Sequence, residues 1–163
     1  MTASLMALIN PRSSCRAARK PLSQEPLNNL VKVQSLRSEP PDQGELDGLV
    51  SAAERKLRDA ENMTVSADSR FILAYDASHS LALAALRWHG FRPDKKRYIV
   101  FETLVHTVSF PAARWRLLYD CHAKRNLALY EGGTFDDEQL IGELIAVTRE
   151  LLAAVRALGP VAT

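Results

Sequence analysis

One apolar segment in the middle of the chain constrains the fold most strongly. It is SADSRFILAYDASHSLALAALRWHG, residues 66–90. Its apolar residues recur on nearly every side of a helix, and such a helix is stable in water only when other helices cover it. Ser66 and Asp68 suit the first turn of this helix, and Gly90 suits its end. The segment therefore predicts a central helix within a bundle.

Three other segments repeat apolar residues at the spacing of a single helix face. We expect these outer helices over about residues 42–62, 111–131 and 136–158. Asp42 and Glu45 predict a capping box at the start of the first, and Pro111 suits the first turn of the second. Four long helices with short connections predict an all-α fold, an antiparallel up-down four-helix bundle. An additional short helix is expected over about residues 97–108, where the segment Tyr98–Phe101 could also form a strand.

The segments outside the bundle differ in composition from the bundle itself. Residues 1–26 predict a flexible basic N-terminal arm, because four Arg and Lys residues and no acid precede Glu25. A targeting peptide and an overextended start codon are alternatives, whereas a secretory signal would place its charges before its apolar part. Residues 27–41 form a linker or short lead-in that ends at Glu39-Pro40-Pro41. The bundle itself is expected over residues 42–159, followed by a tail, 160–163.

Composition excludes several function classes. The 163 residues carry a net charge of +2, which is too small to indicate non-specific nucleic-acid binding without a local patch. Two cysteines make no disulfide framework and fit a reduced, cytoplasmic location. The four histidines lack zinc-site spacing, no glycine-rich loop opens a helix, and no apolar run reaches the roughly 20 residues that span a membrane. We therefore expect no metal, no cofactor and no membrane partner.

The segment CHAKRNLALYEGG, residues 121–133, gathers the polar residues that suggest a site. On a helix, His122 and Arg125 lie on one stripe, while Asn126 and Tyr130 lie on the adjacent one. The planar guanidinium of Arg125 matches the geometry of phosphate oxygens.

These residues resemble the HEPN superfamily, small helical-bundle proteins of prokaryotic toxin–antitoxin and defence systems. The resemblance covers about residues 45–158 and rests on the central helix and on the segment KRNLALYEGG, similar to the family's signature of Arg, a polar residue and a later His or Tyr. It implies a homodimer whose cleft binds RNA or nucleotide phosphate, with metal-independent RNA cleavage as the family's activity. Arg125 and Asn126 match the catalytic signature, whereas Tyr130 replaces the usual catalytic histidine. The further RNA contacts expected are Lys124, Arg97 and Lys96.

The replacement of histidine by Tyr130 leaves three alternatives. Cleavage needs a base for the ribose 2′-hydroxyl and a cation for the phosphorane. A tyrosine, whose pKa is about 10, is a poor base beside a histidine at about 6.5. Either His122 supplies the base, or the site binds phosphate without cutting it. The resemblance also suggests that a minimal nucleotidyltransferase partner transfers AMP to Tyr130.

Plainer interpretations compete with each of these roles. Arg125 and Asn126 suit the end of any helix, and Tyr130 could be a half-buried aromatic residue. His122 could be a surface histidine or a hydrogen-bonded core histidine, and His79 could be a hydrogen-bonded core residue. The alternative function is a non-catalytic helical-bundle adaptor that binds a protein partner.

Overall fold

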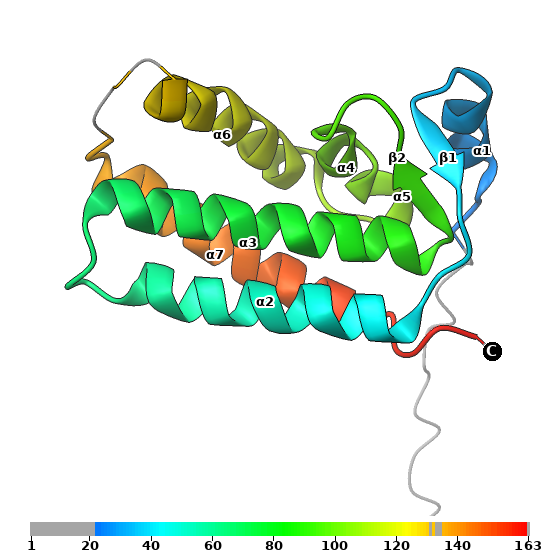
Figure 1. The fold of residues 1–163 in the computed structure, drawn as a ribbon, viewed down its shortest axis with the longest axis horizontal. Helices are drawn as coiled ribbons and strands as arrows, with labels where there is room; N and C mark the ends of the chain where they lie inside the picture. Colours follow the sequence, from blue (N-terminus) through cyan, green and yellow to red (C-terminus); the bar gives the residue numbers. More distant parts are fainter. Residues whose placement is uncertain (1–21, 131, 133–134, 163) are drawn as a thin grey trace, which may run out of the picture.

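The computed structural model describes residues 22–130, 132 and 135–162 (Figure 1). Its helices and strands in chain order are α1 (Glu25–Lys32), β1 (Leu36–Ser38), α2 (Gln43–Glu61), α3 (Ala67–Trp88), β2 (Phe91–Pro93), α4 (Ile99–Glu102), α5 (Leu104–Thr107), α6 (Ala112–Tyr130) and α7 (Glu138–Arg156). The protein is mostly helical, as predicted, and its helices pack against one another. None of the helices described combines the length and hydrophobicity needed to cross a membrane.

Helix α3 is the centre of the fold. It contacts α2, α7, α6, the short helices α4 and α5, and β2 (Figure 1). Many of its residues are fully buried, and several are small: Phe71, Ala74, Ala77, Leu81, Ala82, Ala84, Ala85 and Leu86. Small side chains allow neighbouring helices to approach closely, which explains how one helix accommodates so many partners. Its all-round apolar pattern is therefore confirmed as that of a central helix.

The four long helices run in alternating directions along the chain (Figure 1). Helices α2 and α3 form a closely packed hairpin, and α7 also packs along α3. Helix α6 contacts α3 and α4 far more than it contacts α7. Among the residues that the structure describes, none covers the opposite side of α6, where Leu127 and Tyr130 are exposed.

The fold differs from the all-α prediction in a small antiparallel sheet. Strand β1 pairs with β2, with Arg37 opposite Arg92. The predicted helix over residues 97–108 is also divided into α4 and α5, which meet at Thr103. The alternative strand assignment for Tyr98–Phe101 is wrong, because three of its residues lie in α4 and Tyr98 caps that helix.

The segment before residue 42 contributes to the core. It contains α1 and β1, and its residues Leu27 and Leu36 are buried. Most of the predicted arm, residues 1–21, lies outside the described residues, whereas Glu25 begins α1. In the predicted tail, the backbone N–H of Val161 donates a hydrogen bond to the side chain of Gln43.

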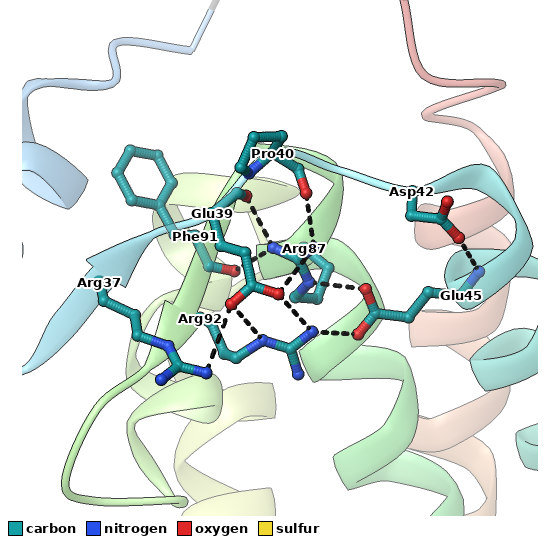
Figure 2. Close-up of polar contacts among 8 residues, drawn as sticks. All are labelled: Arg37, Glu39, Pro40, Asp42, Glu45, Arg87, Phe91 and Arg92. Carbon is teal, nitrogen blue, oxygen red and sulfur yellow. Dashed lines mark hydrogen bonds and ion pairs between the residues drawn. The ribbon is translucent and has the colours of Figure 1, made fainter.

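The predicted helix starts are accurate, with one correction. The Asp42 side chain accepts from the backbone N–H of Glu45 at 2.7 Å, and Ser66 caps α3 in the same way. The capping box, however, is only half formed. The Glu45 carboxylate does not accept a hydrogen bond from the backbone N–H of Asp42; it binds Arg87 and Arg92 instead (Figure 2).

Arg87 is the centre of a buried polar cluster (Figure 2). Its side chain is 1 % exposed, yet it donates to the Glu45 carboxylate at 2.9 Å and to the backbone carbonyls of Glu39 and Pro40 at 2.8 and 2.7 Å. Arg92 joins the cluster through Glu39 and Glu45. These contacts fasten the connection between β1 and α2 to the end of α3, and they are structural in character.

Candidate functional site

A polar cavity of about 280 Å³ lies beside α3 and α6. It is lined by side chains from four parts of the chain: Lys56 of α2; Tyr75, Asp76, His79 and Ser80 of α3; Arg97, before α4; and His122 and Arg125 of α6. The α3 residues come in two neighbouring pairs one helical turn apart, so they share one helix face. The two α6 residues are three positions apart and likewise share a face. Helical spacing therefore groups each set on one face, and the packing of α3 with α6 brings the two faces to the same cavity.

His122 is held through both of its ring nitrogens. The Tyr75 hydroxyl oxygen is 2.7 Å from Nδ1, and the Asn126 amide nitrogen is 3.3 Å from Nε2. Because an amide nitrogen can only donate, this arrangement makes Nε2 the acceptor and leaves the proton on Nδ1, which donates to Tyr75. The hydroxyl proton of Tyr75 then remains available to another acceptor.

The surroundings of this pair favour the neutral forms of both residues. Burial and the nearby Arg125 charge lower the pKa of His122 below its usual value. Burial raises the pKa of Tyr75 to about 12, so its hydroxyl stays protonated at neutral pH. The cavity thus contains a neutral imidazole and an uncharged hydroxyl donor.

Arg125 lies over the Tyr75 ring, with its guanidinium carbon 5.2 Å from the ring centroid. Its Nε is 3.4 Å from the Asp76 carboxylate, within ion-pair range, yet this buried atom makes no hydrogen bond. The contact between Arg125 and Asp76 is therefore an ion pair without a hydrogen bond at Nε. Lys56 approaches the same carboxylate from α2 at 3.7 Å.

His79 connects α3 to the segment before α4. Its Nε2 is 3.2 Å from the backbone carbonyl of Arg97, and because a carbonyl can only accept, Nε2 carries the proton. Burial lowers the pKa of His79, so the ring is neutral at pH 7. The predicted hydrogen bond of His79 is confirmed, but His79 is not a core residue, because its side chain is only half-buried and lines the cavity.

The charges around the cavity are predominantly positive. Lys56, Arg97 and Arg125 are three cations, and Asp76 is the one carboxylate among the lining residues, which leaves a net formal charge of +2. An excess of cations beside the Tyr75 hydroxyl donor suits an oxygen-rich anion.

The structure brings together some of the predicted site residues. His122, Arg125 and Arg97 line the cavity, and Asn126 adjoins it through His122.

Three other predicted residues lie elsewhere. Tyr130, the last residue of α6, is 83 % exposed and does not line the cavity, so its interpretation as a half-buried aromatic residue is wrong. Lys124 and Lys96 are exposed and also lie outside the cavity lining.

Sequence reasoning missed several of the cavity residues. Tyr75, Asp76 and Ser80 belong to the central helix, and Lys56 belongs to the helix before it. The sequence feature that could have identified them is the polar segment YDASHS, which interrupts an otherwise apolar helix. A polar stripe on a buried helix requires either polar partners or a cavity.

Within the described residues, no group of three or more His, Cys, Asp or Glu side chains is arranged to hold a metal ion. Comparisons of the chain with known protein families, with curated proteins and with solved structures find no match.

Proposed function

We propose that this chain is a HEPN-like helical-bundle protein that binds RNA or a nucleotide phosphate, as part of a prokaryotic toxin–antitoxin or defence-type module. The main support for the proposal is that Arg125, His122 and Arg97 line one cavity, in which cations outnumber carboxylates. Four long helices in alternating directions and the adjacent Arg125 and Asn126 of α6 are further support.

The same cavity contains the groups that metal-independent RNA cleavage requires. His122 would take the proton of a ribose 2′-hydroxyl at Nε2, once the substrate displaces the Asn126 amide. The 2′-oxygen would then bond to phosphorus, the 5′-oxygen of the next nucleotide would leave and take a proton from water, and Arg125 would stabilise the phosphorane. Tyr130 has no part in this step, since it lies away from the cavity.

The proposed partners are a second copy of the chain and a minimal nucleotidyltransferase. The exposed residues Leu127 and Tyr130 are three positions apart on α6, so they share a face that a partner helix would bury. A homodimer through this face would leave one cavity in each copy, because Arg125 is two positions from Leu127 and points to the other side of α6. The exposed hydroxyl of Tyr130 is accessible for AMP transfer.

RNA binding is tested by fluorescence anisotropy with a labelled single-stranded oligonucleotide. Replacing Arg125 with alanine removes a charge-assisted contact to phosphate, so we expect its Kd to rise roughly tenfold. Arg116→Ala removes the same charge from an exposed position of α6 outside the cavity and should leave Kd close to the wild-type value. Equal effects of the two substitutions, or no RNA binding by the wild type, would reject the proposal.

Cleavage is tested separately, by incubating the oligonucleotide with the protein in EDTA. Loss of cleavage in His122→Ala with retained RNA binding would assign His122 as the base. Intact RNA with the wild-type protein would restrict the function to binding.

The adaptor alternative is favoured by the exposed apolar residues of α6. It predicts a co-purifying protein that is lost in Leu127→Asp, together with no RNA or nucleotide binding. Light scattering of the wild type and this variant also tests the homodimer, which Leu127→Asp should convert to monomers.

A further inference from the structure

We infer that the cavity between α3 and α6 selects a phosphate monoester, the terminal phosphate of an RNA strand or a nucleotide, over an internal phosphodiester. This inference rests on the proposed function and specifies its ligand. It also favours binding over cleavage, because recognition of the terminal phosphate of a strand does not require cleavage of an internal phosphodiester.

The net charge of the cavity lining favours a phosphate monoester. Three cations and one carboxylate line the cavity and leave a net formal charge of +2. A phosphate monoester carries about −1.5 to −2 at pH 7, and therefore neutralises this excess. A phosphodiester carries a single negative charge and leaves one cation uncompensated in a partly desolvated site.

The cations are also available to a ligand. Asp76 lies between Lys56 and Arg125, but its contacts with them are long, at 3.7 and 3.4 Å, and neither has hydrogen-bond geometry. Both cations thus keep donors that a phosphate oxygen could accept, and a ligand need not first break a strong ion pair.

The donors surround the cavity instead of lining one side of it. Lys56 approaches from α2, Arg125 from α6 and Arg97 from the segment before α4, while the Tyr75 hydroxyl proton on α3 is left available by the orientation of His122. A monoester presents three terminal oxygens to such a set. A diester presents only two, because its other two oxygens are bonded to carbon.

The volume of the cavity favours a small ligand. At about 280 Å³ the cavity is slightly below the range for small-molecule sites, which is roughly 300–1,000 Å³. It has room for one phosphate and part of its nucleoside. An extended strand passing through it would need more space.

Titration calorimetry with the full chain tests the inference. The first comparison is AMP against its methyl ester, which keeps the nucleoside and the phosphorus but carries one charge less. We expect the ester to bind roughly tenfold more weakly, and adenosine to bind more weakly still. Equal affinities for AMP and its ester would overturn the inference.

The second comparison identifies the source of the monoester. RNA oligonucleotides of one sequence carry a 5′-phosphate, a 3′-phosphate or no terminal phosphate. Tighter binding of either phosphorylated strand supports end recognition. If only AMP shows the preference, the ligand is a free nucleotide. If all three strands bind equally and AMP also binds no better than its ester, the inference fails, and the proposed function survives provided that Arg125→Ala weakens RNA binding. If no RNA or nucleotide binds, both fail.

Two matched substitutions locate the preference in the cavity. Lys56→Ala should reduce the roughly tenfold preference for AMP over its ester, because one of the three cations is lost. Arg55→Ala removes a charge from an exposed neighbouring position of α2 outside the cavity and should leave the preference unchanged. Circular dichroism of both variants verifies the fold, and equal effects of the two substitutions would place the ligand elsewhere.

Discussion

Arg87 shows what a single buried cation does in this fold. Its guanidinium is almost fully enclosed, and it contacts the carboxylates of Glu39 and Glu45 and the backbone carbonyls of Glu39, Pro40 and Phe91 (Figure 2). Removal of the guanidinium would leave the carbonyls of Glu39 and Pro40 without their side-chain donor, while Arg92 would remain the partner of both carboxylates. A charge at this position cannot be recognised from the sequence as a core residue, because most of its partners lie more than forty residues away.

We therefore expect Arg87→Ala to lower the free energy of unfolding by about 3–5 kcal/mol, the range for breaking a buried ion pair. Urea denaturation measures this loss. Arg149→Ala, which breaks an exposed pair with Glu61, should cost less than about 1 kcal/mol. Similar losses in the two variants would show that the Arg87 cluster is not a stabilising element.

At the scale of the element, helix ends are where sequence and structure agree best. Asp42, Ser66 and Asp137 each cap a helix with a side-chain oxygen. Gly90 follows the end of α3 with φ +84°, in the left-handed region that favours glycine. These signals are local, and a local signal can be recognised without knowledge of the fold.

Substitution of two different glycines with alanine should change the free energy of unfolding in opposite directions. Gly90→Ala forces a side chain into the left-handed region and should lower the free energy of unfolding by about 1–2 kcal/mol. Gly142, in α7, has no neighbouring atom within 4 Å of the place where a Cβ would lie, so Gly142→Ala should raise it by about 0.5–1 kcal/mol through helix propensity. Thermal or urea unfolding measures both changes, and changes of the same sign would contradict this assignment.

Non-local elements could not be predicted in the same way. Strands β1 and β2 are three residues each and pair across more than fifty positions of sequence, so neither has a periodic pattern of its own. Helix α1 likewise contributes only Leu27 to the core. The cavity is a further case: residues of α3 and α6 meet only after both helices pack, so His122 and Arg125 were recognised but Tyr75 and Asp76 were not.

At the scale of the whole molecule, stability should depend on pH through its histidines. Burial is the main cause that lowers the pKa of His79, His89 and His122. Below a pH of about 6.5 the unfolded chain binds more protons than the folded one, so the free energy of unfolding falls as the pH falls. Above that pH the contribution is fully present.

We expect the urea midpoint to be lower at pH 5.5 than at pH 7.5. His89 donates to the backbone carbonyl of Thr107 and is remote from the cavity lining, so His89→Gln should reduce this pH dependence without altering the site. A midpoint that rises on acidification would contradict the burial of neutral histidines.

The four histidines provide a direct test of phosphate binding beside α3 and α6. His79 and His122 line the cavity, whereas His89 and His106 do not. In NMR spectra of the imidazole groups, added AMP or RNA should shift the signals of His79 and His122 and leave those of His89 and His106 in place. Shifts confined to His89 or His106, or no shift at saturating ligand, would contradict phosphate binding at this site.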